Sequence, residues 1–101
     1  MNEISSIKKP PHNVELEQQI LGAVLANNDR YHGLSFLRAD HFYYPVHADI
    51  WRNISARIER DHIASPVTLK TDLADHAGLK ELGGAGYLAR MVGTSVSSFA
   101  V

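Results

Sequence analysis

The sequence predicts an all-α fold, a compact bundle of five or six short helices around a central helix at about Pro45–Asp61. Apolar residues recur at helical spacing along most of the 101 residues, and no segment shows the apolar–polar alternation of a half-buried strand. Proline, asparagine and glycine fall at the ends of these periodic segments, where they start or stop helices. A chain of this length forms one domain with a modest core.

The central helix begins at Pro45, because the fixed φ of proline suits the first helical position and its missing N–H is not needed there. Its apolar stripe covers an arc of about 140° on a helical wheel, the width of a helix that buries one side. The stripe consists of Val46, Ile50, Ile54 and Ile58, with Trp51 beside them. Three aromatic residues just before the helix can fold back over its first turn, as a hydrophobic staple does: Phe42, Tyr43 and Tyr44.

The first helix covers about Val14–Ala26. Asn13 caps it, and Glu15 and Glu17 lie in the first turn, where the helix dipole favours negative charge. Asparagine and aspartate residues then end this helix, and a short second helix is expected at about Arg30–Leu37.

Glycines mark the ends of the later helices. A fourth helix is expected from residue 67 or 68 to about Ala77, where Gly78 fits the left-handed residue that ends a helix. A glycine pair then breaks the chain again, and a last helix follows and ends at Gly93.

Three parts of the chain are distinguished by composition. Residues 1–11 are polar and end in two prolines, so we expect a flexible N-terminal arm with no core to join. Residues 12–93 form the helical head domain. Residues 94–101 begin as a polar linker and turn apolar at the end, as in a chain cut from something longer.

The predicted core comes from the apolar faces of these helices: Leu21, Phe42, His47, Ile50, Trp51, Ile54, Leu73 and Leu88. His47 is polar but lies inside the apolar arc of the central helix, and Glu17 lies likewise in the apolar face of the first helix. A buried polar group without a partner costs about 1–3 kcal/mol. Either the two helices pack and both side chains contact each other or a backbone group, or each lies near its helix end and still reaches water. Neither alternative is catalytic.

Composition argues against several classes of function. The net charge of −1 gives no electrostatic basis for binding nucleic acid or anionic lipid. The absence of cysteine rules out disulfides and thiolate metal sites, and favours a reducing compartment. No apolar run approaches the roughly 20 residues of a membrane span. We therefore expect a cytoplasmic protein that does not contact a membrane.

No catalytic, cofactor-binding or metal site is predicted. The six histidines are scattered without the close spacing of zinc-ligand pairs, so imidazoles at the surface or paired in the core are expected. The glycine cluster at 83–86 lacks the lysine and hydroxyl residue of a phosphate-binding loop. Arginines of the central helix are interleaved with acidic residues, unlike a stripe that follows phosphates.

Four motifs together resemble the N-terminal domain of the bacterial replicative DNA helicase of the DnaB type. They are PHNVELEQQILGAVL at 11–25, ADHFYYPVHADIW at 39–51, PVTLKTDL at 66–73 and LGGAGYLARM at 82–91. Their order and spacing extend the resemblance from residue 11 to about residue 96. The residues that match the family's motifs are Glu17, Leu21 and Gly22, then Phe42, Tyr43, His47 and Ile50, and finally Gly83, Gly84, Tyr87 and Leu88.

The resemblance implies a head from a hexameric ring motor whose ATPase lies in a separate C-terminal domain. The heads of this family pair into a collar on which primase docks. We therefore expect a non-catalytic domain for oligomerisation and primase docking in chromosome replication. ATP and magnesium are expected only in the motor domain, which this chain lacks, and residues 94–101 would start the linker to the missing hairpin and motor.

The isolated head is expected to form only a weak dimer, because separate heads lose the effective concentration that tethering supplies. The sequence does not indicate which surface contacts another head or primase. A different interpretation is a small helical DNA-binding domain of the helix-turn-helix type. The net charge of −1 and the lack of a basic recognition helix argue against it, so direct DNA binding is not expected.

Overall fold

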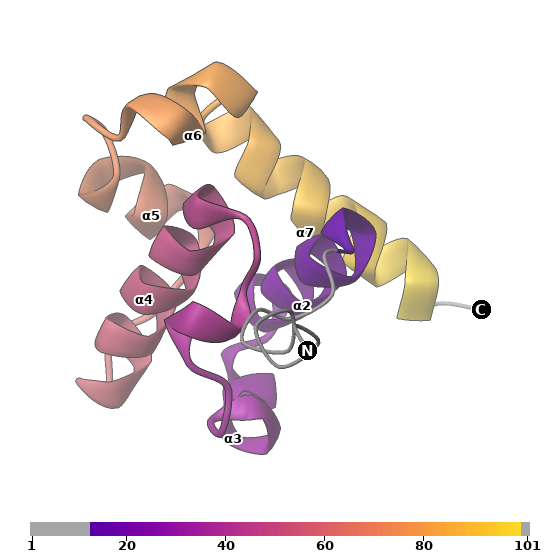
Figure 1. The fold of residues 1–101 in the computed structure, drawn as a ribbon. Helices are drawn as coiled ribbons and strands as arrows, with labels where there is room; N and C mark the ends of the chain where they lie inside the picture. Colours follow the sequence, from indigo (N-terminus) through magenta and orange to yellow (C-terminus); the bar gives the residue numbers. More distant parts are fainter. Residues whose placement is uncertain (1–12, 100–101) are drawn as a thin grey trace, which may run out of the picture.

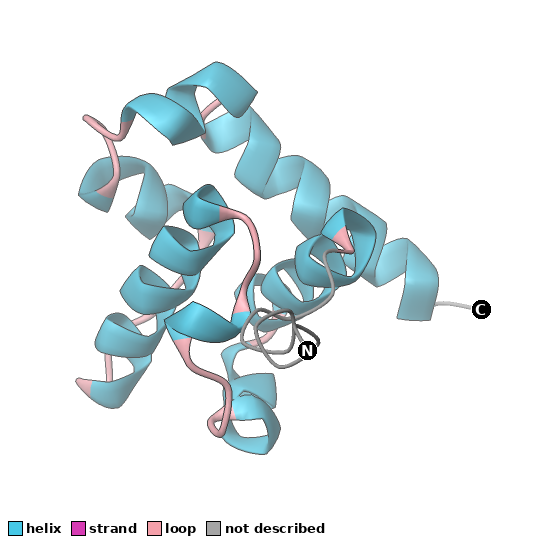
Figure 2. Cartoon of the chain, viewed as in Figure 1, coloured by secondary structure: helices cyan, strands magenta, loops and turns pink. Residues whose placement is uncertain are grey.

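A computed structural model describes the chain over residues 13–99, and its side chains over residues 13–95. Within this range six α-helices and two 3₁₀ turns follow one another, and no strand is present. They are α2 (Val14–Ala26), η1 (Asn28–Arg30), α3 (Tyr31–Leu34), η2 (Ala39–His41), α4 (Pro45–Glu59), α5 (Pro66–Asp72), α6 (Ala77–Leu82) and α7 (Ala85–Phe99). The all-α prediction is confirmed (Figure 2). The arm expected at residues 1–11 lies outside the described residues.

The helices form two groups. Figure 1 shows α4 and α5 on one side of the molecule, and α2 crossing α7 on the other. Gly22 permits the close crossing of α2 and α7, because a Cβ at this position would lie 2.1 Å from the carbonyl oxygen of Met91. From its side, the central helix α4 contributes Ile50, Trp51 and Ile54 to the shared core, each at most 1% exposed.

Helix starts follow the expected cap chemistry. Asn13 Oδ1 accepts the Leu16 N–H at 3.0 Å at the start of α2. Pro45 occupies the first turn of α4. At α5, Ser65 and Thr68 exchange hydrogen bonds between side chain and backbone, which satisfies two N–H groups that the helix leaves without partners.

Most predicted core residues are buried. These are Leu21, Phe42, His47, Ile50, Trp51, Ile54 and Leu88. Leu73 is only partly buried and packs against the core from outside. The reason is that α5 ends at Asp72, so Leu73 is the first residue after the helix.

The expected helix from residue 67 or 68 to Ala77 is wrong at its end. The chain leaves the helix after Asp72, and Gly78 lies inside the new helix α6, which His76 caps by accepting the Leu79 N–H on Nδ1 at 3.1 Å. A Cβ at Gly78 would lie 2.8 Å from Val46 Cγ2. Glycine is therefore needed there for close approach to α4, and not for a left-handed turn.

The last helix does not end at Gly93. It continues to Phe99, so the polar linker expected from Thr94 is helical up to that residue. A glycine inside a helix costs only about 1 kcal/mol. Met91 and Ser95, one turn apart around Gly93, are both buried, and this packing keeps α7 helical.

Two further helix bounds differ from expectation. The second helix is split into η1 and the single turn α3, which ends at Leu34 and not at Leu37. The central helix ends at Glu59, because Asp61 has a φ of 62° and so leaves the helical region.

Candidate functional site

A buried carboxylate lies at the centre of the polar groups that sequence analysis singled out. The Glu17 side chain is 8% exposed and that of His47 is 2% exposed. The Glu17 carboxylate accepts a hydrogen bond from His47 Nδ1 at 2.8 Å and another from the Tyr43 N–H at 2.6 Å. Of the two alternatives left open by the sequence, the structure shows direct contact between the two side chains.

The other face of His47 contacts α7. His47 Nε2 lies 2.6 Å from the Tyr87 hydroxyl, and Gln18 Nε2 donates to the same hydroxyl at 3.0 Å. Because an amide nitrogen only donates, the Tyr87 oxygen accepts from Gln18, which leaves the Tyr87 proton available to His47 Nε2 in the tautomer that carries its proton on Nδ1. The row of groups from Glu17 through His47 to Tyr87 thus joins α2, α4 and α7.

This row has the order of an acid, an imidazole and a hydroxyl, and its members bond to one another inside the protein. Both nitrogens of His47 are engaged inside the protein, and Tyr87 is only 7% exposed. The arrangement holds three helices in register. From the sequence, Tyr87 is only a match to the family's last motif, because a hydroxyl at a core-facing helix position has no spacing pattern of its own.

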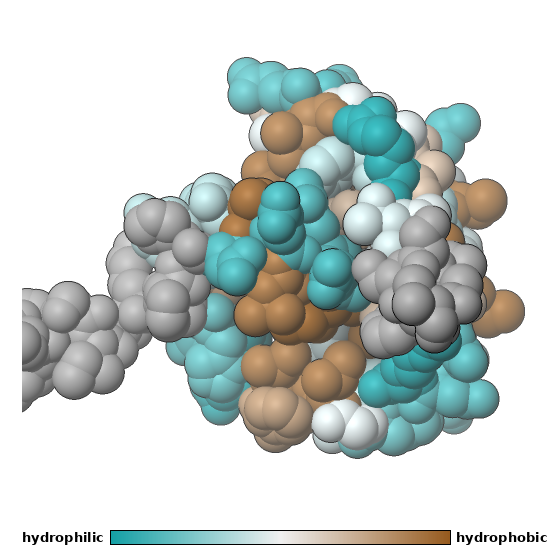
Figure 3. Space-filling view, turned by 90° about the vertical axis from the view of Figure 1, so that its right-hand side faces the viewer, coloured by the Kyte–Doolittle hydropathy of each residue, from teal (hydrophilic) through white to brown (hydrophobic). Residues whose placement is uncertain are grey.

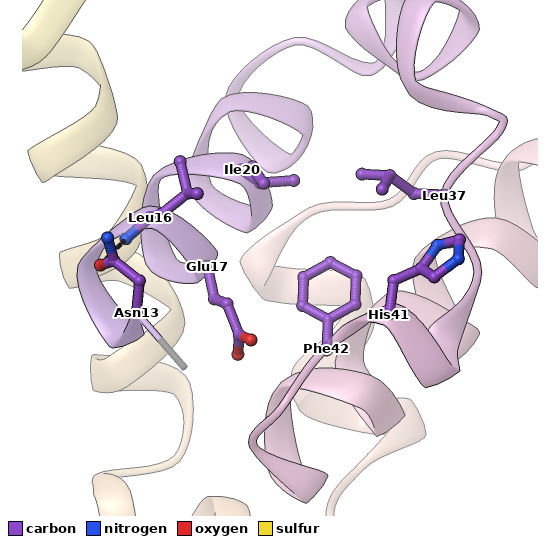
Figure 4. A pocket seen from close by; sticks show the side chains of 7 residues that line it. All are labelled: Asn13, Leu16, Glu17, Ile20, Leu37, His41 and Phe42. Atoms are coloured by element: carbon purple, nitrogen blue, oxygen red, sulfur yellow. Dashed lines mark hydrogen bonds between the residues drawn. The ribbon is translucent and has the colours of Figure 1, made fainter. Parts of the chain in front are cut away.

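An apolar hollow lies beside this row, between α2 and the segment of residues 37–42. Its volume is about 430 Å³, and it is lined by Asn13, Leu16, Glu17, Ile20, Leu37, His41 and Phe42. Figure 4 shows the residues of α2 on one side of it, with Leu37, His41 and Phe42 on the other. We name it the α2 hollow. A second hollow of about 340 Å³ is lined by His47 and Tyr87 themselves, together with apolar side chains that include Val14, Val46 and Leu82.

Large apolar side chains are exposed at several places on the described surface. The most exposed are Phe36 at 70%, Ile63 at 67%, Val67 at 75% and Leu16 at 51%. Figure 3 shows apolar surface in the middle of the face turned toward the viewer, between hydrophilic areas. Of these four side chains, Leu16 lines the α2 hollow. An exposed apolar side chain beside a hollow is typical of a surface that binds another protein.

The other histidines among residues 13–95 have hydrogen-bonding partners or are exposed. His41 Nδ1 accepts the Arg38 N–H at 3.0 Å, and His76 Nε2 lies 2.7 Å from Asp49 Oδ2. His32 and His62 are exposed. Among residues 13–95, no three histidine or acidic side chains lie together as a metal site requires.

Three side chains have pKa values that their surroundings shift: Tyr31, Arg57 and Asp72. The Arg57 guanidinium, whose Nη2 donates to Asp72 Oδ1 at 3.0 Å, holds the pKa of the Asp72 carboxyl below its ordinary value. Burial raises the pKa of Tyr31, whose hydroxyl donates to Glu59 at 2.7 Å. Both contacts fasten α4 to its neighbours and lie away from the α2 hollow. In the described part of the chain, no helix is long and apolar enough to cross a membrane.

Comparison with known proteins agrees with the motifs. The family described as "DnaB-like helicase N terminal domain" matches residues 9–101. The "Replicative DNA helicase DnaB" of Rickettsia bellii is 42% identical over 87 residues, which cover 85% of this chain and 18% of that protein. The protein of the same name from Rickettsia felis is 39% identical over 99 residues, which cover 94% of this chain and 20% of the relative.

A solved structure shares the fold. The crystal structure of the N-terminal domain of DnaB helicase from Mycobacterium tuberculosis matches with a TM-score of 0.74 and 32% sequence identity, over 85% of this chain and 60% of that one. The chain thus spans about a fifth of the length of the curated relatives that it matches. By its sequence and its fold, this chain belongs to the family of DnaB-like helicase N-terminal domains.

Proposed function

We propose that this chain is a non-catalytic head domain that assembles with copies of itself and docks primase on a replicative DNA helicase. The observation that carries the proposal is the apolar surface around α2, where a hollow of about 430 Å³ lies next to side chains as exposed as Leu16 at 51%. Such a surface loses unfavourable contact with water when another protein covers it.

The internal polar row supports an assembly role over a catalytic one. Glu17, His47 and Tyr87 use their hydrogen-bonding groups to join three helices, and this fixes the shape of the surface above them. A rigid surface costs less conformational entropy when it binds a partner.

The parent protein that we propose is an ATP-dependent DNA helicase that acts as a hexamer in the cytoplasm. The relatives are replicative DNA helicases of which this chain spans about a fifth. The motor with its ATP and magnesium would lie in the remaining part of such a protein. The head itself should need no cofactor and should not bind DNA directly.

Sedimentation equilibrium of this chain at micromolar to millimolar concentration tests the assembly role. A monomer in weak equilibrium with a dimer is expected, because untethered heads lack the effective concentration of a ring. Primase binding should be measured with single heads and with two heads joined by a flexible linker, since a site shared by two heads binds weakly to one. A chain that stays monomeric and does not bind primase even when tethered would overturn the proposal.

A nucleic-acid assay tests the alternative of a DNA-binding domain. The chain should give no salt-dependent shift with random duplex DNA and no ATP hydrolysis. Binding that weakens steeply as salt rises would show phosphate contacts and would favour the alternative.

A further inference from the structure

A third hollow lies between α5, α6 and the start of α7. In the view of Figure 1, α6 lies above α5 and continues through a glycine turn into α7. The volume of the hollow is about 210 Å³. Its lining residues come from these helices and the turns between them: Lys70, Leu73, Ala74, Leu79, Lys80, Gly84 and Ala85. We name it the lysine hollow, after the two charged residues that line it.

The walls of the lysine hollow are apolar. Leu79 is 3% exposed and belongs to the core, and Leu73 packs against that core from outside. The other uncharged wall residues are alanine or glycine, whose small side chains leave the space open. An apolar cavity of about 150 Å³ takes up a benzene molecule. The lysine hollow therefore has room for one large aliphatic side chain.

Both charged residues that line this hollow are positive. Lys70 on α5 and Lys80 on α6 are exposed, and neither forms an ion pair within the described part of the chain. No acidic side chain of the described residues lines the hollow, and Glu81, which follows Lys80, lines the second hollow instead. Apolar walls with a positive rim complement an apolar group that has negative charge beside it.

We propose that the lysine hollow is a docking site for an acidic segment of another protein. One aliphatic side chain of that segment fills the hollow, and carboxylates on either side of it face Lys70 and Lys80. The aliphatic side chain supplies binding by removing apolar surface from water, and the carboxylates select the segment by its charge. The inference goes beyond the proposed function, because the lysine hollow shares no lining residue with the α2 hollow.

The combination of walls and charges favours an acidic protein segment over other occupants. A basic segment would be repelled by both lysines. The phosphates of a nucleic acid would meet the lysines but would leave the apolar walls uncovered. The net charge of −1 also gives the chain no general attraction for nucleic acid.

A short synthetic peptide tests the site directly. The probe is acetyl-Asp-Asp-Leu-Asp-Asp-amide, added at up to millimolar concentration to the ¹⁵N-labelled chain. The amide shifts that change should be centred on Leu79, Gly84 and Ala85, and binding should weaken as salt rises. Unchanged shifts at these amides, or changes centred on another surface, would overturn the inference.

Two further peptides separate the apolar part of the contact from the charged part. Replacing the leucine of the probe by alanine should weaken binding by about tenfold, because less apolar surface is buried. Acetyl-Lys-Lys-Leu-Lys-Lys-amide should not bind. Equal affinity for the leucine and alanine peptides would show that charge alone attracts the probe, and would overturn the inference.

Charge reversal in the protein is the sharper test because it has a rescue. Lys70→Glu and Lys80→Glu should each weaken binding of the acidic probe severalfold. Arg60→Glu is the matched control, since it changes the net charge equally at an exposed position that lines a different hollow. The double lysine variant should instead bind the basic peptide. Equal weakening by Arg60→Glu, or no binding of the basic peptide to the double variant, would overturn the inference. Because both lysines are exposed, the variants should keep the helical circular dichroism of the parent chain.

Filling the hollow tests its apolar walls without changing any charge. Ala74→Leu adds an aliphatic side chain at an exposed position that lines the hollow, and should weaken binding of the acidic probe by about tenfold. Ala89→Leu is the matched control, because Ala89 is exposed on α7 but does not line the hollow. Equal effects of the two variants would overturn the inference.

Two measurements identify a different occupant. The double variant with Lys70→Glu and Lys80→Glu should self-associate in sedimentation equilibrium as the parent chain does. Loss of self-association in this variant would assign the hollow to a second copy of the chain. Random duplex DNA should not displace the bound acidic probe, and displacement would assign the two lysines to nucleic acid. Either result would overturn the inference.

Discussion

The Glu17 carboxylate and the His47 imidazole contact each other inside the domain, with 2.8 Å between Oε1 and Nδ1. The contact joins α2 to α4, which are 30 residues apart along the chain at these positions. Both groups would be costly to bury alone, and together they form a pair that the helices must bring into register.

Removal of the carboxylate should destabilise the domain strongly. In Glu17→Ala the Tyr43 N–H and His47 Nδ1 both lose their acceptor, and each buried donor left without a partner costs about 1–3 kcal/mol. Glu17→Gln keeps one acceptor oxygen and should cost less. Urea unfolding followed by circular dichroism gives both losses. Equal stability of Glu17→Ala and the parent chain would mean that water replaces the carboxylate.

Removal of the Tyr87 hydroxyl tests the other end of the row. Tyr87→Phe keeps the ring packing but leaves His47 Nε2 without its donor, at a cost of about 1–2 kcal/mol. The ¹⁵N chemical shifts of His47 should report the change in hydrogen bonding at Nε2. Tyr87→Leu removes the ring as well and should cost more. Unchanged His47 shifts in Tyr87→Phe would contradict a Tyr87 proton directed to His47 Nε2.

The central helix and the first helix could be predicted from the sequence, because each begins at a proline or an asparagine cap and has a long apolar stripe. Val14–Ala26 begins and ends as predicted, and α4 begins at Pro45 as predicted. The same periodicity placed Glu17 and His47 within apolar arcs, but it left open whether they contact each other, a backbone group or water.

Features that depend on close approach in three dimensions could not be predicted. The sequence does not show whether Gly78 forms a left-handed turn or lets Val46 approach closely. Only the packed structure distinguishes these two roles. Asn28 is a similar case. The sequence indicated a helix stop there, while the structure shows its side chain donating to the carbonyls of Val24 and Ala64 at 2.8 Å each. Local sequence carries no information about a partner 36 residues away.

The Trp51 side chain should be the largest single contributor to core packing. It is 1% exposed, and its indole N–H donates to the Leu37 carbonyl at 3.1 Å. Trp51→Ala should cost about 3–5 kcal/mol in urea unfolding. Trp51→Phe retains an aromatic ring and should cost less. Wild-type tryptophan fluorescence with a maximum typical of water exposure would contradict this placement.

The crossing of α2 and α7 should not tolerate a methyl group. A Cβ at Gly22 would lie 2.1 Å from the Met91 carbonyl oxygen, which is backbone and cannot rotate away. Gly22→Ala should therefore cost about 1–3 kcal/mol or more, as overpacking does. Gly33→Ala is the matched control, since nothing lies within 4 Å of its Cβ position and alanine favours the helix. Equal thermal midpoints for the two variants would contradict the close crossing.

The ion pair between Arg57 and Asp72 should make stability depend on pH in the acidic range. The neighbouring guanidinium lowers the pKa of the Asp72 carboxyl in the folded state, so folding favours the ionised form. Its contribution is complete above the ordinary carboxyl pKa, and it is lost as the pH falls through the lower folded pKa. Asp72→Asn should therefore lower the urea midpoint at neutral pH, and the difference from the parent chain should vanish in strong acid. Asp75→Asn, at an exposed position three residues away, should leave the midpoint unchanged at both pH values. A difference between Asp72→Asn and the parent chain that stays constant down to strong acid would show that the carboxylate charge does not hold α5 to α4.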